Sequence, residues 1–168
     1  DQRPKPDMVA VSRFEMPRAW LQELFGNIDG MLLRTGPLYA SPKGIGAILC
    51  RVDIARNQIE PWVALEIPLK EEDAQWLGVP WGEAASQGAL EAWAVLLAIR
   101  FWKVRLMSIP LLIKSDSTVA LAMAAKLSSA SPVINWIGAE LAMRLEVLNI
   151  PKLVGHHIPG YLNKEADW

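Results

Sequence analysis

The sequence contains a single cysteine, Cys50, among its 168 residues, so an internal disulfide framework and a cysteine-based zinc site are both excluded. One thiol fits a reducing compartment. Apolar runs of 18 residues are also lacking, and we therefore expect no transmembrane helix. Neither sign of charge is in excess, since 17 basic and 18 acidic residues give a net charge of −1. Domains that bind nucleic acid unaided are usually basic, so neighbouring domains would have to supply much of any such contact.

Hydrophobic residues, by contrast, make up 52% of the chain, which is enough for one sizeable core in a domain of this length. Residues 1–16 combine prolines with scattered charges and are typical of a linker. Pro17 is typical of the first turn of a short helix that would run to Phe25. We therefore divide the chain into a linker plus short helix at 1–30 and one domain at 31–168, which we expect to be truncated in its last helix.

The apolar pattern after residue 30 predicts five strands and four helices. We expect the strands at 31–38, 45–52, 59–67, 111–113 and 152–158. We expect the helices at 84–102, 117–127, 132–148 and after Asn163, with a loop at 68–83. Strands that lie close in sequence tend to pair, so the first three should form an antiparallel meander. The order β-β-β-α-β-α-α-β-α predicts an α/β fold: a five-stranded mixed sheet with helices on both faces.

Glu91 stands out in the long helix, because Arg100 is the only other charged residue between Ala84 and Phe101. A helix this apolar is buried on most sides. An ionised carboxylate there is costly unless it is paired or binds a cation. The alternative is a glutamate on a narrow exposed stripe near the helix start, where negative charge is favoured. Spacing alone leaves both interpretations open.

Two further acids lie at the ends of predicted elements. Asp116 follows the buried strand at 111–113, and open α/β sheets place ligand sites at that carboxyl edge. The alternative is that Asp116 caps the helix that begins beside it. Asp167 would lie one turn into the helix capped by Asn163, where the helix dipole also favours an acid.

Four segments, in this order, resemble the ribonuclease H domains of LTR-type retroelement reverse transcriptases. They are Ala40-Ser41-Pro42-Lys43-Gly44-Ile45-Gly46-Ala47-Ile48-Leu49, Ala89-Leu90-Glu91-Ala92, the strand ending in Asp116-Ser117, and the run from His157 to Asp167. The family reads Asp-Ala-Ser-x-x-Gly-x-Gly-Ala-x-Leu in its first hairpin and Pro-Gly-x-x-Asn-x-x-Ala-Asp near its end. The resemblance covers about 31–168, and its C-terminal motif is the most specific part.

The resemblance implies a two-metal site. In that family, four carboxylates at one sheet edge hold two Mg²⁺ or Mn²⁺ ions, which activate a water and stabilise the leaving oxygen of a phosphodiester. Carried over by position, Glu91, Asp116 and Asp167 would be catalytic residues and metal ligands. The implied substrate is the RNA strand of an RNA–DNA hybrid, and the implied partner is an adjacent reverse transcriptase domain in a polyprotein. The implied location is intracellular, cytoplasmic or nuclear, without a membrane.

The first acidic ligand of the family is missing. Tyr39 stands at its position, and Asp29, ten residues upstream, is too far along an extended strand to replace it. A tyrosine hydroxyl, with an ordinary pKa near 10, is neutral at pH 7 and a poor ligand. Pro37 additionally removes a hydrogen-bond donor from a strand that is central in this fold. The sequence therefore predicts impaired or absent cleavage.

Three functions are consistent with these residues. The first is a metal-dependent ribonuclease H domain, active or weakened. The second is a non-catalytic ribonuclease H-like domain that serves as a structural or nucleic-acid tethering module. The third is another enzyme on the same fold, such as an integrase, transposase or resolvase, although those families place their last acid as a glutamate in a longer helix. We interpret His156 and His157 as strand-end residues rather than as a catalytic loop histidine.

Overall fold

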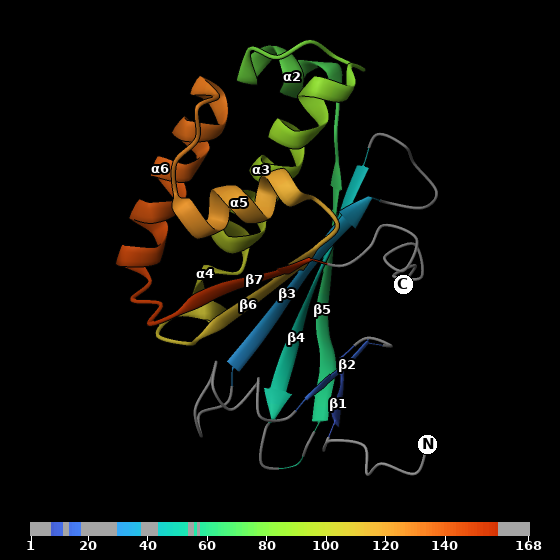
Figure 1. Ribbon diagram of the computed structural model, residues 1–168, viewed down its shortest axis with the longest axis vertical. Coiled ribbons are helices and arrows are strands. Elements are labelled where there is room, and N and C mark those ends of the chain that lie inside the picture. The colour runs from blue at the N-terminus through green and yellow to red at the C-terminus, as the bar shows by residue number, and fades with distance from the viewer. Residues whose placement is uncertain are drawn as a thin grey trace.

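The computed structural model describes residues 8–11, 14–17, 30–37, 44–53, 56 and 58–157, and the fold is given for these residues. Five strands form one mixed sheet in the order β5-β4-β3-β6-β7 (Figure 1). The strands are β3 (Gly30–Pro37), β4 (Gly44–Asp53), β5 (Gln58–Pro68), β6 (Leu111–Ser115) and β7 (Leu153–His157). β3, β4 and β5 form the predicted antiparallel meander, while β6 and β7 run parallel to β3. The predicted sheet is confirmed, with every strand boundary within two residues.

The helices confirm three predictions and correct one. They are α2 (Glu71–Leu77), α3 (Ala84–Phe101), α4 (Lys103–Leu106), α5 (Thr118–Lys126) and α6 (Pro132–Val147). The sequence predicted α3, α5 and α6 but not the single turn of α4, and it assigned 68–83 to a loop that instead contains α2. No helix in the described residues is both long and apolar enough to cross a bilayer.

The helix α2 forms because its ends are well satisfied. Three acids occupy its first turn, where the helix dipole favours negative charge. The carboxylate of Asp73 accepts a hydrogen bond from the main-chain N–H of Lys70 (2.8 Å), and Gly78 ends the helix with a left-handed φ of 73°. Flanking glycines and prolines made this short helix look like loop in the sequence.

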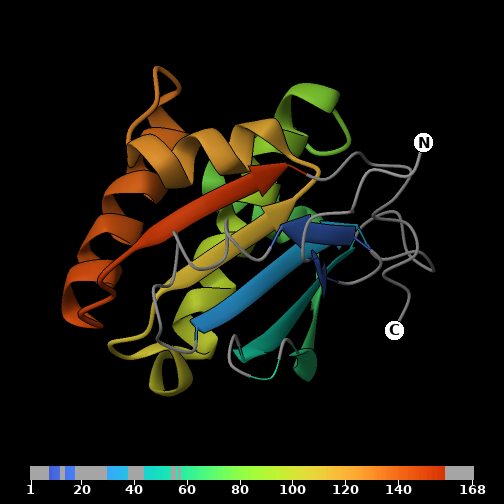
Figure 2. The ribbon, with the colours of Figure 1, turned by 60° about the horizontal axis from the view of Figure 1, so that its bottom comes forward.

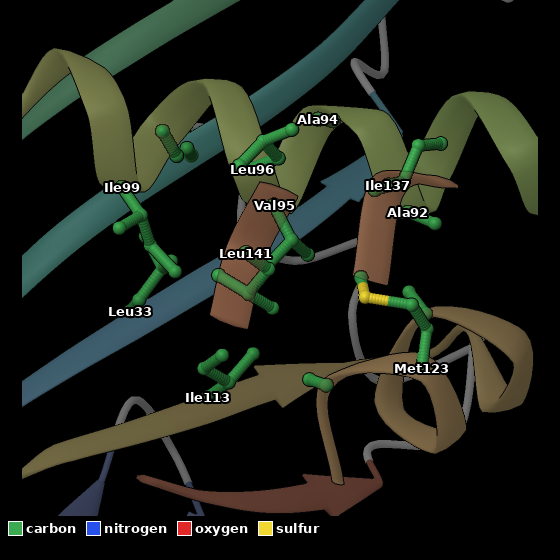
Figure 3. Packing of buried hydrophobic residues seen from close by; sticks show 14 of the residues in the cluster. Leu33, Ala92, Ala94, Val95, Leu96, Ile99, Ile113, Met123, Ile137 and Leu141 are labelled. Carbon is green, nitrogen blue, oxygen red and sulfur yellow. The ribbon is translucent and has the colours of Figure 1, made fainter. Parts of the chain in front are cut away.

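The main core lies between the sheet and α3, α5 and α6. Figure 3 shows Leu33 of β3 and Ile113 of β6 pointing toward Val95, Ile99 and neighbouring residues of α3. Side chains alternate between the two faces of a strand, so these odd-numbered residues face the helices. The helix α3 is buried around most of its circumference, as its apolar sequence predicted.

The opposite face of the sheet carries a second, smaller cluster. Its buried members, Leu32, Ile48, Cys50, Val52 and Leu112, all come from strands. Figure 2 shows β7, β6, β3 and β4 side by side, with α5 running beside β7. The helix expected after Asn163 lies outside the described residues, as does the proposed helix after Pro17.

The N-terminal residues correct the interpretation of 1–16 as a linker. β1 (Met8–Val11) and β2 (Phe14–Pro17) form an antiparallel hairpin, and β1 contacts β5. Pro17 therefore ends a strand instead of opening a helix. Four residues per strand are too few for the apolar alternation to stand out among prolines and charges.

The helix α6 packs unusually close to the end of α5. A Cβ added to Gly138 would lie 2.8 Å from the main-chain carbon and oxygen of Leu127. Leu127 itself ends α5 with a left-handed φ of 56°. Pro132 opens α6 after Ser131, as predicted, although the Ser131 side chain makes no capping hydrogen bond. This contact fixes the two helices that flank the carboxyl end of β6.

Candidate functional site

Glu91 and Asp116 come together at the carboxyl end of β6. Glu91 lies in the first half of α3, and Asp116 follows directly after Ser115, the last residue of β6. They are close enough that the charge of Asp116 contributes to raising the pKa of Glu91. Two acids separated by 24 residues of sequence thus share one edge of the sheet.

The side chain of Glu91 is half-buried and hydrogen-bonded. Burial is the main reason that its pKa lies above the ordinary value of 4.5. Hydrogen bonds from Ser117 and Gln87 act in the opposite direction, and the amide nitrogen of Gln87 lies 3.4 Å from a Glu91 carboxylate oxygen. Glu91 is therefore neither fully buried nor on an open stripe, because neighbouring polar groups compensate part of its desolvation.

Ser117, and not Asp116, caps α5. The hydroxyl oxygen of Ser117 accepts the main-chain N–H of Ala120 (3.1 Å), and the Ser115 hydroxyl accepts the N–H of Ser117 (3.1 Å). The alternative interpretation of Asp116 as the cap is therefore wrong. Its carboxylate lies beside Glu91 without serving the helix end.

His157 is a further neighbour that the sequence interpretation treated only as a strand-end residue. It does end β7, and it pairs in register with Ser115. Its Nε2–H donates to the main-chain oxygen of Asp116 (3.2 Å). Parallel pairing of β6 and β7 brings about this contact, and no local motif around His157 indicates it.

Three basic residues line up across the sheet next to the acidic pair. Arg34, Lys114 and His156 lie in register on β3, β6 and β7, on the face opposite α3. Arg34 is 3% exposed and Lys114 is fully buried. Burial, and then the charge of Arg34, lower the pKa of Lys114 from 10.5 to about 8. Burial, Lys114 and His157 lower the pKa of His156.

The strand β3 has no acidic residue. It pairs with β6 through Arg34 and Lys114, and the same register continued by two residues brings Gly36 level with Asp116. Pro37 is the last residue of β3, beyond its final pair with β6, so its missing N–H falls at the strand end. Tyr39 and Asp167 lie outside the described residues.

Carboxylate oxygens are the donors that Mg²⁺ and Mn²⁺ prefer, and Glu91 and Asp116 supply them at this edge. Within the described part of the chain, no group of three His, Cys, Asp or Glu side chains is arranged to hold a metal ion. The described donors therefore suit a share in one hard cation, and further ligands have to come from residues outside the described ranges.

Comparison with known proteins identifies the fold. No protein-family model and no curated protein matches the chain. Among solved structures, ribonuclease H1 from the halophilic archaeon Halobacterium salinarum NRC-1 is similar at 10% identity and a TM-score of 0.51, covering 83% of this chain and 91% of that chain. LC11-RNase H1, isolated from compost by a metagenomic approach, is similar at 16% identity and a TM-score of 0.50, with the same coverage. The chain has the ribonuclease H-like fold that the sequence resemblance implied.

Proposed function

We propose that this chain is a ribonuclease H-like domain of a retroelement polyprotein whose hydrolytic site is weakened. Glu91, Asp116 and Asp167 ligate a divalent cation, and Tyr39 stands where the first acidic ligand is expected. The observation that carries the proposal is the pairing of Glu91 with Asp116 at the carboxyl edge of β6, on a fold shared with ribonuclease H1. The substrate is the RNA strand of an RNA–DNA hybrid, and the partner is an adjacent reverse transcriptase domain inside the cell.

The roles of the described residues follow from their contacts. Ser117 and Gln87 orient the Glu91 carboxylate through hydrogen bonds. Ser117 also takes over the capping of α5, which leaves the Asp116 carboxylate for a ligand. A bound Mg²⁺ or Mn²⁺ supplies a polarised water and stabilises negative charge on a phosphodiester oxygen.

The weakening follows from the composition of β3. A two-metal site needs a carboxylate that bridges both ions, and β3 offers none between Gly30 and Pro37. Arg34 and Lys114 place positive charge about two residues, or about 7 Å of strand, from Asp116. This charge disfavours a second cation. Loss of one essential catalytic group commonly costs roughly a factor of 10³ or more in rate.

The same observations support the second candidate, a non-catalytic structural or nucleic-acid tethering domain. It differs from the first in one measurable respect, because it requires no divalent cation at Glu91 and Asp116. Calorimetry with Mn²⁺ separates the two candidates. Binding that is lost in Asp116→Asn supports the weakened nuclease, and binding of two ions contradicts the tethering domain.

Restoring the missing acid tests the proposed activity directly. We would incubate an RNA–DNA hybrid and Mn²⁺ with Tyr39→Asp and Gly36→Asp, the two positions indicated by motif and by strand register. Tyr39→Asn and Gly36→Asn are the uncharged controls. We expect one aspartate variant to cleave at least tenfold faster than the unchanged chain, and Asp116→Asn to abolish this gain. Folded variants that never cleave would remove the nuclease proposal.

A further inference from the structure

A second cluster of cations lies at the other end of the sheet, on the face that carries α3. The guanidinium carbons of Arg51 (β4) and Arg105 (α4) each lie 4.2 Å from the ring centroid of Trp62 (β5). Both arginines are exposed, while Trp62 is half-buried and packs against the main core. The two guanidinium groups are therefore held by one ring, no more than about twice that distance apart.

The surroundings of this cluster are strongly basic. The 24 residues between Glu91 and Asp116 include four basic residues and no acid. Two of them, Arg100 and Lys103, are exposed at the end of α3 and the start of α4, next to Arg105. Glu60 occupies the position opposite Arg51 on β5. A chain with a net charge of −1 thus concentrates positive charge on one part of its surface.

Stacking makes these arginines suitable for binding an anion. A guanidinium that lies on an aromatic face keeps its N–H groups in its own plane, where they match the two oxygens of a phosphate. The ring also limits side-chain motion, so less entropy is lost on binding. Two such groups within about 8 Å cover about two nucleotide steps of a strand, at roughly 3.4 Å per step.

We propose that Arg51, Trp62 and Arg105 form a second nucleic-acid contact site that binds phosphodiester groups of the strand backbone. The proposal takes its ligand class from the proposed function. Arg51 pairs with Met31, which pairs with Leu111, five residues before Asp116. Strand geometry therefore separates the two sites by about 17 Å along the strands and 10 Å across them, or about 20 Å in all. A duplex needs about six base pairs to reach both sites.

Fluorescence anisotropy with a labelled 18-base-pair RNA–DNA hybrid tests the site, with EDTA present so that no cleavage occurs. We expect Arg51→Ala/Arg105→Ala to bind about tenfold more weakly or worse. The slope of log affinity against log salt should fall by up to about two. The control Arg56→Ala/Lys126→Ala removes two exposed charges elsewhere and should change affinity less than threefold.

Two conservative changes separate stacking from charge. Arg51→Lys/Arg105→Lys keeps the charge but loses the planar fork, and should bind severalfold more weakly. Glu60→Gln should tighten binding. Single-stranded RNA and duplex DNA should show the same dependence on both arginines, since the backbone is recognised.

Several outcomes would overturn the site: unchanged binding by the arginine-to-alanine pair, no binding of nucleic acid by the unchanged chain, or displacement by polyglutamate as effective as by nucleic acid. The last would assign the surface to an acidic polypeptide. Cleavage by the aspartate variants of Tyr39 or Gly36 does not depend on this result, so failure of this site and failure of the nuclease proposal are distinguishable.

Discussion

The hydroxyl of Ser117 joins Glu91 to the start of α5. Its oxygen accepts the N–H of Ala120, and the same hydroxyl hydrogen-bonds to the Glu91 carboxylate. One small side chain therefore both ends the strand-to-helix connection and holds an acid of the candidate site. The helix α3 and the segment after β6 are coupled through this group.

Replacing Ser117 with alanine should have two separate effects. Loss of the cap should lower the free energy of unfolding by about 1 kcal/mol. Loss of the hydrogen bond should raise the pKa of Glu91 further, because that bond favours the ionised form. Urea unfolding and an NMR titration of Glu91 measure the two effects. Thr118→Ala, at an exposed neighbouring position, is the control, and an unshifted Glu91 titration in Ser117→Ala would contradict the coupling.

The buried Lys114 predicts a distinctive alkaline pH dependence. The folded chain releases its proton near pH 8, whereas the unfolded chain holds it to about 10.5. Between these values the unfolded state binds more protons, so the contribution of Lys114 to the free energy of unfolding rises with pH. The rise is at most a few kcal/mol, at about 1.4 kcal/mol per pKa unit.

Urea unfolding of the unchanged chain and of Lys114→Met between pH 7 and 11 isolates this contribution. The variant should be the more stable of the two near pH 7, relative to their difference at pH 11. A difference that stays constant over this range would show that Lys114 keeps an ordinary pKa in the folded chain.

Gly138→Ala should destabilise the chain, because its Cβ would meet main-chain atoms of Leu127 at 2.8 Å. A main chain held between two helices cannot move aside easily, and overpacking of this kind costs about 1–3 kcal/mol. Gly88→Ala is the matched control in α3, since its Cβ would meet only the side chain of Val119, at 3.0–3.2 Å. Thermal unfolding should rank Gly138→Ala well below Gly88→Ala, and equal melting temperatures would be inconsistent with this packing.

Trp76 should anchor α2 despite being 65% exposed. Its ring stacks on Trp93 of α3 with centroids 5.9 Å apart and meets the ring of Trp136 of α6 edge-on at 5.5 Å. Each aromatic pair contributes about 0.5–1.5 kcal/mol. We expect Trp76→Ala to lose about 1–3 kcal/mol and to speed hydrogen exchange in α2. Phe101→Ala is the control, since Phe101 is 66% exposed and its ring contacts its neighbour Trp102.

Local patterns were sufficient for the elements of the sheet. Alternating apolar residues located β3, β4 and β5, and the short apolar run before Asp116 located β6 as a parallel strand. The same patterns missed α2 and the hairpin of β1 and β2. In both cases the element is short, and its stability comes from contacts, of Trp76 with Trp93 and of β1 with β5, that lie outside the segment itself.

The candidate site was predicted in part. Glu91 and Asp116 were identified from an apolar helix and a strand end, and the structure brings them together. The sequence left open whether Asp116 was a helix cap, because Asp and Ser are both good caps and stand side by side. Only the hydrogen bond between Ser117 and Ala120 decided this question.

The sequence by itself determined the fold class and the residue types at the carboxyl edge of β6, because apolar periodicity and strand-end acids are local properties of the chain. Tertiary structure alone decided which charges meet. Arg34 and Lys114 are 80 residues apart, and each looks like an interruption in an apolar strand until register pairs them. Arg51, Trp62 and Arg105 likewise come from three elements, and their contact exists only because the sheet and α4 pack together. Electrostatic energy depends on distance through space, which sequence separation does not specify.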